Sequence, residues 1–243
     1  MTVGPCPETR FGTWFISSRI WTEYVVRPTV ADLVRLLGPS TVSRPVILDI
    51  GCGVGGALPM LDAAFAPAAL IGRDLDLELL RRAAREAAPR CRGRVDLAVA
   101  AATRLDLHDA TVDMILCHQT LHHLEDPEAA ARELHRVLRP GGVLLVAESC
   151  APFTRSLRVR LLFRHALDVQ RLAAEWVDLV RATGFVVDSK RVSMPYPWWS
   201  RPDFGLLEWL GRPVPACREE TVVHLVALKP SEGITSAGGT RRP

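Results

Sequence analysis

Two carboxylates and a group of glycines have the types and spacing needed to bind a nucleotide-like cofactor. Residues 46–56 read V-I-L-D-I-G-C-G-V-G-G, a short apolar run that leads directly into a glycine-rich turn. Glycines let a backbone approach a ligand, and a helix predicted from Ala57 to Phe65 would point its first amides at that ligand. Asp74 follows roughly 20 residues on, where an acidic side chain binds a ribose hydroxyl in dinucleotide-binding folds.

The identity of the cofactor depends on Asp49. Gly51, Gly53 and Gly56 satisfy the G-x-G-x-x-G pattern of dinucleotide-binding proteins, so an NAD-dependent oxidoreductase is one hypothesis. Asp49, however, lies at the mouth of the predicted strand, where a pyrophosphate would need positive potential. A carboxylate there favours a ligand that carries a cation or hydroxyl groups.

Four segments of the chain resemble the successive motifs of the class I S-adenosylmethionine-dependent methyltransferases. They are V-I-L-D-I-G-C-G-V-G, L-I-G-R-D-L-D, V-D-M-I-L-C-H-Q-T-L-H-H-L and R-V-L-R-P-G-G-V-L-L-V-A-E, in the family's order and spacing, over about residues 45 to 150. The resemblance implies an α/β, Rossmann-like, doubly wound seven-stranded sheet, mostly parallel, with an antiparallel last strand between the fifth and sixth. It also implies S-adenosyl-L-methionine as cofactor.

The resemblance further implies a set of cofactor-binding residues. Asp74 would bind the ribose hydroxyls, which agrees with the ability of a carboxylate to accept from two vicinal hydroxyls, and Asp76 is a minor alternative. Ala101 stands where the family has an acid for the adenine amino group, so we expect adenine to meet backbone near residues 102–103 and apolar packing, or Asp106. The full expected set is Asp49, Gly51, Cys52, Gly53, Gly55, Asp74, Leu75, Ala102, Thr103 and His118.

Histidines follow the strand predicted from Val112 to Cys117. His118 would lie at the carboxyl end of that strand, near the topological switch point where such sheets bind ligands. As a near-neutral base, it could accept a proton from a hydroxyl or amine, but we favour a role in lining the methionine end of the cofactor. His122 and His123 belong to an L-H-H-L pattern common in the family, and catalysis by His123 is a second alternative to packing in the core.

The chain is expected to form one methyltransferase domain over residues 41–230, preceded by an N-terminal helical cap over 1–40 and followed by a disordered tail over 231–243. A helix is predicted from Val30 to Leu37 and another from Asp168 to Ala182. The remaining predicted strands are Ala69–Arg73, Val95–Ala100, Val143–Ala147, Phe185–Val187 and Thr221–Leu228.

Two insertions, at about residues 150–168 and 193–218, are predicted to form lids over the site. The first alternates arginines with leucines, which indicates a basic amphipathic helix over residues 150–167. It could act as a membrane contact, as a clamp for an anionic substrate or simply as a lid, and we expect a lid. Aromatic residues of the cap and of the second insertion would form an acceptor wall, with Trp14, Trp198 and Trp199 as substrate-binding residues, although core packing or a dimer contact would also explain them.

Composition excludes several classes of function. The six cysteines show no C-x-x-C pair and share no metal-ligand spacing with the histidines, so neither a metal site nor disulfides are expected. The net charge of +3 is too small to indicate nucleic-acid binding by itself. No apolar run reaches the roughly 18 residues that cross a bilayer and no signal peptide is apparent, so a cytoplasmic protein without an integral membrane segment is expected.

The activity implied by the resemblance is methyl transfer from S-adenosylmethionine to a small acceptor. The residues C-H-Q-T after the fourth strand lack the Asn/Asp-Pro-Pro-aromatic motif of base amino-group methylation and the Pro-Cys nucleophile of pyrimidine C5 chemistry. An aromatic or lipophilic acceptor, such as a phenol, a quinone-like ring or another natural product, is therefore favoured, with O-, N- and C-methylation all open. The alternatives are an RNA methyltransferase that uses the arginine-rich insertion and a binding protein that keeps the cofactor fold without catalysis.

Overall fold

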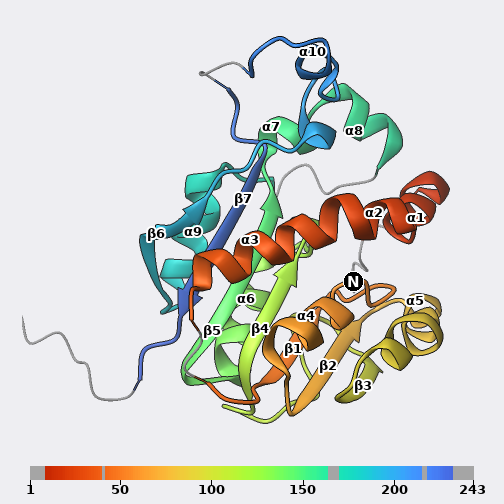
Figure 1. The fold of residues 1–243 in the computed structure, drawn as a ribbon. Coiled ribbons are helices and arrows are strands. Elements are labelled where there is room, and N and C mark those ends of the chain that lie inside the picture. The colour runs from red at the N-terminus through yellow and green to blue at the C-terminus, as the bar shows by residue number, and fades with distance from the viewer. Residues whose placement is uncertain (1–8, 40–41, 164–169, 215–217, 232–243) are drawn as a thin grey trace, which may run out of the picture.

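The computed structural model describes residues 9–39, 42–163, 170–214 and 218–231. Its centre is a seven-stranded sheet in the order β3-β2-β1-β4-β5-β7-β6. Neighbouring strands are parallel except for β7, which runs antiparallel to both β5 and β6, as predicted (Figure 1). The strands are β1 (Val46–Ile50), β2 (Ala69–Asp74), β3 (Arg94–Val99), β4 (Val112–His118), β5 (Leu138–Ser149), β6 (Val186–Ser193) and β7 (Val222–Leu228).

Two strands, β5 and β6, extend several residues beyond their predicted bounds because their ends pair with β7 or the segment after it. The R-P-G-G segment is part of β5, since Gly141 donates to the Lys229 carbonyl at 2.8 Å and the Lys229 amide donates to Gly142 at 3.0 Å. β6 continues past an irregularity between Val187 and Val192 and pairs with β7 on both sides of it. Sequence periodicity does not show such irregular pairing.

Helices cover both faces of the sheet and enclose two apolar cores. One face is covered by α3 (Arg27–Leu37), α4 (Leu58–Phe65) and the π-helical turn Ala83–Ala87 that continues α5 (Leu77–Arg82). The other face is covered by α6 (Pro127–Val137) and α9 (Ala173–Ala182). Alternate residues of β4 point to opposite faces, with Met114 and Leu116 toward α3 and Ile115 and Cys117 toward α6. This period of two accounts for the two separate cores.

Short helices gather beyond the carboxyl ends of the parallel strands (Figure 1). From the N-terminal part come α1 (Arg10–Ile16), α2 (Arg19–Trp21) and a π-helical turn (Thr22–Val26), and from the insertions come α7 (Ala151–Thr154), α8 (Leu157–Leu162), a 3₁₀ turn (Trp198–Ser200) and α10 (Leu206–Trp209). A further 3₁₀ turn, Ala88–Arg90, precedes β3, and another, Leu121–His123, follows β4.

The first insertion differs from the single amphipathic helix that was predicted. Within its described residues it forms α7 and α8, which are separated because Ser156 adopts an extended conformation (φ −62°, ψ 144°) before α8. The helix predicted from Asp168 begins at Ala173, while residues 164–169 lie outside the described part of the chain. The predicted tail falls almost entirely outside it too. In the described segments, no helix is both long enough and apolar enough to cross a bilayer.

Candidate cofactor and acceptor site

The turn that follows β1 requires glycine because of its positive φ angles. Gly51 has φ +69°, and a Cβ there would overlap Thr120 Oγ1 and lie 2.9 Å from Thr120 Cγ2. Its amide donates to the Arg73 carbonyl at 2.8 Å, which ties the turn to the end of β2. Gly53 has φ +52°, and a Cβ there would meet open space. The turn is therefore closed against β4 at Gly51 and open at Gly53.

Of the other predicted residues of the turn, Cys52 lines the site and Gly55 supports it. Cys52 lines the cavity described below, and burial raises the pKa of its thiol so that it stays neutral. Gly55 does not line the cavity. A Cβ at Gly55 would lie 2.8 Å from the Ala87 Cβ, so this glycine allows the turn to pack against the helical segment that follows α5.

Two carboxylates lie at the ends of neighbouring strands. Asp49 is 3% exposed, lines the cavity and has no hydrogen-bond or ion-pair partner among the described residues. Burial, with a contribution from Asp74, raises the pKa of Asp49 to about 8. Asp74 accepts from the Gly53 amide at 2.8 Å and from the Asp76 amide at 2.9 Å. Asp74 thus holds the turn in place, and its side chain remains partly exposed beside it.

A cavity of about 380 Å³ extends from the glycine turn to the helices beyond the sheet. Its polar end contains Asp49, His118 and Gln119 from the ends of β1 and β4. Its other walls are aromatic, and a volume of this size is within the range of small-molecule sites. The aromatic lining residues are Phe11, Phe15, Trp21, Phe153, Phe163, Trp198, Trp199 and Phe204.

His118 and Gln119 supply polar atoms to this apolar cavity. His118 Nε2 is buried with no hydrogen-bond partner in the described part of the chain, and burial lowers the pKa of His118 to about 3. Gln119 has φ +54°, a rare conformation for a residue with a side chain. The Ser149 hydroxyl donates to Gln119 Oε1 at 2.6 Å, and the side-chain nitrogen of Gln119, Nε2, has no partner among the described residues. A ligand can therefore meet a neutral imidazole and an amide at this point.

The L-H-H-L histidines adjoin a buried carboxylate that the sequence analysis did not identify. Glu148, at the end of β5, is fully buried and accepts from the amides of Thr120 at 2.9 Å and Leu121 at 2.8 Å. His122 Nδ1 lies 2.6 Å from Glu148 Oε2, and the His123 ring contacts the His122 ring at a centroid distance of 4.1 Å, tilted by 39°. Burial raises the pKa of Glu148 to about 8. Both histidines line the cavity, and Glu148 fixes the orientation of His122.

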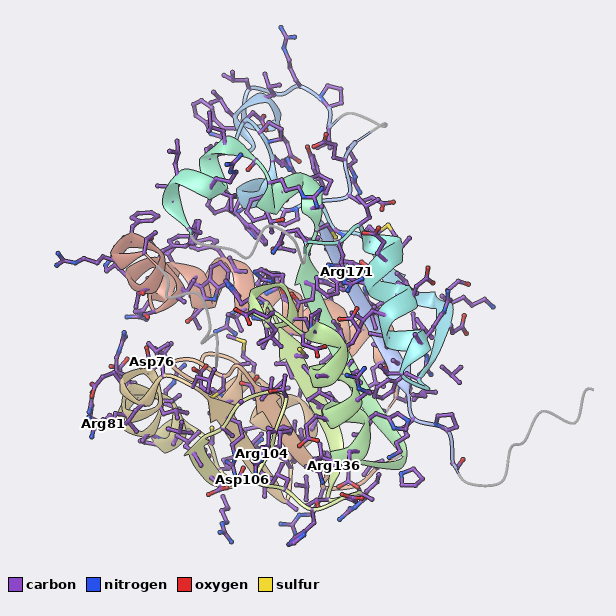
Figure 2. All side chains as sticks on the ribbon, turned by 180° about the vertical axis from the view of Figure 1, so that it is seen from behind. Asp76, Arg81, Arg104, Asp106, Arg136 and Arg171 are labelled. Carbon is purple, nitrogen blue, oxygen red and sulfur yellow. The ribbon has the colours of Figure 1, made fainter. Side chains whose placement is uncertain are left out.

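Leu75 and the residues expected near adenine lie outside the cavity lining. Leu75 is exposed after β2, and after β3 Ala102 is buried while Thr103 is exposed. Asp106 binds Arg73 instead, with Nε to Oδ1 at 2.7 Å. Figure 2 shows Arg104 and Asp106 on the α6 face of the sheet, away from Asp76. The loop is held there because the Leu105 amide donates to Glu133 of α6 at 2.6 Å.

The three predicted acceptor residues are placed differently. Trp198 and Trp199 line the cavity, and the Trp199 ring packs edge-on against Phe153 at 5.3 Å. Trp14 does not line it and lies in a shallow depression beside α5 with Asp76 and Arg82. In α1, Phe11 and Phe15 are one turn apart and line the cavity, while the Trp14 ring contacts the Phe11 ring at 5.7 Å from outside the lining. Helical spacing could have identified this pair in the sequence.

The fold and the site together define a Rossmann-like protein that binds a nucleoside cofactor at the carboxyl ends of its strands. A family model described as a methyltransferase domain matches residues 48–146. The part of the chain from β1 to β5 is thus similar to S-adenosylmethionine-dependent methyltransferases, a family whose cofactor is S-adenosylmethionine. The similarity is concentrated between β1 and β5, as the motifs predicted.

Relatives show how far this likeness extends. Phosphoethanolamine N-methyltransferase 3 of Arabidopsis thaliana is 32% identical over 104 residues, which are 43% of this chain and 21% of that protein. The ubiquinone/menaquinone biosynthesis C-methyltransferase UbiE of Syntrophotalea carbinolica is 34% identical over 106 residues, 44% of each protein. The chain therefore spans less than half the length of these relatives. A phosphoethanolamine N-methyltransferase 2 of Haemonchus contortus, solved with S-adenosyl-L-methionine, shares the fold with a TM-score of 0.67, 19% identity and coverage of 92% of this chain and 58% of that one.

The residues around the turn fit this cofactor. Asp49 offers an unpaired carboxylate to an ammonium or sulfonium group, and the space at Gly53 lets a ligand contact the backbone. Ser17 Oγ and His118 Nε2 are buried without hydrogen-bond partners among the described residues, and both residues line the cavity. Buried polar atoms are normally satisfied, so their isolation indicates that a ligand completes them.

Proposed function

We propose that this protein transfers a methyl group from S-adenosylmethionine to a small, flat, largely apolar acceptor that carries a hydroxyl, amine or nucleophilic ring carbon. One observation carries the proposal: a single cavity runs from Asp49 and Gly53 to an aromatic wall that includes Trp199 and Phe153. An acceptor stacked on that wall would lie next to the polar end of the cavity. Its reacting atom would then face His118 and Gln119.

The protein's own contribution in this proposal is orientation and the exclusion of water. When bound, S-adenosylmethionine supplies a methyl group already activated by the positive charge on sulfur. The π-helical turn after α2 packs on the glycine turn, since a Cβ on Gly56 would lie 3.1 Å from Thr22 Oγ1, and Arg82 of α5 donates to the carbonyl of Ser17, just after α1, at 3.2 Å. These contacts hold Phe15 and Trp21 over the cavity, so bulk water is kept from its polar end.

His118 would act through its neutral imidazole. Because burial lowers its pKa to about 3, it does not hold a proton near neutral pH and is a weak base. A neutral imidazole can still accept a hydrogen bond from an acceptor hydroxyl, and the Gln119 amide can donate one to an acceptor oxygen. We therefore assign both as positioning residues of the acceptor.

The charge of the cavity lining favours a quinone-like or phenolic acceptor over a phosphorylated amine. Arg158 is its one arginine or lysine among the described residues, and it donates to the carbonyls of Arg201 at 2.5 Å and Pro202 at 3.1 Å. Its guanidinium also lies 4.7 Å from the centre of the Phe204 ring. One of its two terminal nitrogens, Nη1, is thus bound to the protein, and no second arginine or lysine of the described lining could join it on a phosphate, whereas aromatic walls suit a ring.

The cofactor part of the proposal is tested by titration calorimetry with S-adenosylhomocysteine on the wild type, Asp74→Ala and Asp76→Asn. Asp74→Ala should weaken binding at least about tenfold, because it removes a predicted ribose acceptor and the partner of the Gly53 amide. Asp76→Asn is the matched control, since asparagine also caps a helix while removing one nearby charge. Thermal unfolding of each variant separates a collapsed turn from a lost ligand contact.

The acceptor part is tested with methyl-labelled S-adenosylmethionine and two sets of acceptors, namely phenols and quinols on one side and phosphoethanolamine on the other. Label should transfer to members of the first set, and Trp199→Ala should lower that transfer without altering the affinity for S-adenosylhomocysteine. Transfer to phosphoethanolamine alone would contradict the assignment of the aromatic wall. An absence of S-adenosylhomocysteine binding would contradict the proposed function altogether.

A further inference from the structure

The helices farthest from the sheet expose large apolar side chains to solvent. On α8, Leu157 is 71% exposed and Leu161 is 73% exposed, and at α10 the values are 82% for Trp209 and 61% for Leu210. Both figures show α8 and α10 at the same end of the molecule, beyond the carboxyl ends of the strands. Four such side chains at one end form a surface that a soluble protein rarely leaves uncovered.

The same helices carry positive charge that has no acidic partner in the described residues. Arg160 is exposed between the two leucines of α8, and Arg212 is exposed just after α10. The acids of this region are engaged elsewhere: Glu208 pairs with Arg201, and Asp203 accepts from the amides of Gly205 and Leu207. Glu219 and Glu220 belong to the segment that leads into β7. The surface on α8 and α10 is thus both apolar and basic.

We propose that this surface, defined as Leu157, Arg160, Leu161, Trp209, Leu210 and Arg212, docks on an anionic phospholipid bilayer. Leucine and tryptophan side chains on short helices can enter the headgroup region, while arginines meet lipid phosphates. The charge decides the occupant, because pairing this face with a second copy of itself would place Arg160 and Arg212 against like charges.

Docking here would connect the bilayer with the cavity. Val159 and Leu162 of α8 line the cavity, as does Phe204 just before α10, so the elements that would touch lipid also form the acceptor wall. A lipophilic acceptor dissolved in the bilayer would reach the cavity through this end of the protein. This last step rests on the proposed function, whereas bilayer docking itself does not.

The test is flotation of the full chain with two kinds of vesicle, phosphatidylcholine alone and phosphatidylcholine mixed with phosphatidylglycerol. The wild type should float with the mixed vesicles and do so less as salt is raised. Trp209→Ser combined with Leu210→Ser should lower binding to mixed vesicles about tenfold or more, since two large apolar contacts are lost. Arg160→Gln combined with Arg212→Gln should lower binding to mixed vesicles and leave binding to phosphatidylcholine unchanged.

Two controls match these variants. Val186→Ser changes an exposed apolar residue on β6, at one edge of the sheet. Arg85→Gln combined with Arg94→Gln removes two exposed arginines near β3, at the other edge. Both should bind vesicles as the wild type does. S-adenosylhomocysteine calorimetry on every variant reports the proposed function separately, so that docking and cofactor binding can fail independently.

Two results would overturn the proposal. One is a wild type that does not float with the mixed vesicles at low salt. The other is a wild type that sediments as a dimer and becomes a monomer in the Trp209→Ser and Leu210→Ser variant, because that surface would then be an interface between copies.

Discussion

Replacing Gly51 by alanine should destabilise the protein through two separable effects. An alanine at φ +69° costs about 1–2 kcal/mol of backbone strain. Its Cβ would also overlap Thr120 Oγ1 and lie 2.9 Å from Thr120 Cγ2. Thr120 cannot move easily, since its hydroxyl donates to the Ile50 carbonyl at 3.0 Å and its amide donates to Glu148 at 2.9 Å. Overpacking of this kind costs about 1–3 kcal/mol more, so we expect a total loss of about 2–5 kcal/mol.

Two companion variants isolate the steric part. Gly53→Ala introduces a Cβ at φ +52° with open space around it, so its cost should be the backbone strain of about 1–2 kcal/mol alone. Thr120→Ala removes the two closest atoms and leaves only the Cβ at 3.2 Å. It also loses the hydroxyl donor shared by the Ile50 and His118 carbonyls, at a cost of about 1 kcal/mol. In the double variant Gly51→Ala with Thr120→Ala, the steric cost should largely disappear, which gives a favourable coupling of about 1–3 kcal/mol.

Urea unfolding followed by tryptophan fluorescence measures the free energy of unfolding of the three single variants and the double variant. Calorimetry with S-adenosylhomocysteine reports whether the glycine turn still binds ligand. The reasoning predicts that Gly51→Ala is clearly less stable than Gly53→Ala and that Thr120→Ala rescues it. Equal losses for the two glycine variants would refute it. So would a double variant whose loss is the sum of the two single losses, because additivity means that the side chains do not meet.

Two further predictions concern carboxylates whose pKa values are shifted. Since burial raises the pKa of Asp49 to about 8 and a bound cation favours the carboxylate, binding of S-adenosylmethionine at pH 7 should release protons and strengthen as the pH rises toward 8. Calorimetry in buffers of different ionisation enthalpy should show this release in the wild type and not in Asp49→Asn, and equal release in both would contradict it. Asp32 accepts from His224 at 2.8 Å and from Ser193 at 2.9 Å, and with Arg35 these bonds hold the pKa of Asp32 well below its usual value. A carboxylate with a depressed pKa stabilises the fold at pH values above its usual pKa of 3.8. Asp32→Asn should therefore lower the free energy of unfolding by about 1–3 kcal/mol at pH 7 and by progressively less below pH 3.8. Urea unfolding measures this loss, and a loss that does not change with pH would contradict the prediction.

Local sequence signals predicted where the strands of the sheet lie in the chain. The apolar runs with their glycine and proline boundaries identify the strands, and family topology supplies their order, including the antiparallel β7. The errors lie at strand ends and in the insertions. β5 begins at Leu138 because its first residues pair with β4 and with Lys229, a contact between distant segments that no local pattern contains.

The candidate site divides in the same way between local and tertiary information. The glycine turn, with Asp49 just before it, is a contiguous signal; in the structure Asp49 lines the cavity and Asp74 accepts from the Gly53 amide. Glu148 and Gln119 were missed because their roles depend on neighbours from other strands: Glu148 is defined by the amides after β4, and Gln119 by Ser149. A buried carboxylate at a strand end is a signal only when its donors are known.

Arg73 explains why Asp106 does not replace the acid that the family has at the position of Ala101. Its carbonyl accepts from the amides of Gly51 and Cys52 at 2.8 and 3.2 Å, and its buried guanidinium binds Asp96 and Asp106. Asp106 was the nearest carboxylate that could have replaced the acid missing at Ala101, but a buried arginine requires its acidic partners. Adenine recognition would therefore depend on backbone groups and apolar packing, and under the proposed function the charged contacts to the cofactor would come from Asp49 and Asp74. We therefore expect cofactor affinity to depend on the glycine turn after β1, and the choice of acceptor to depend on the aromatic wall of the cavity.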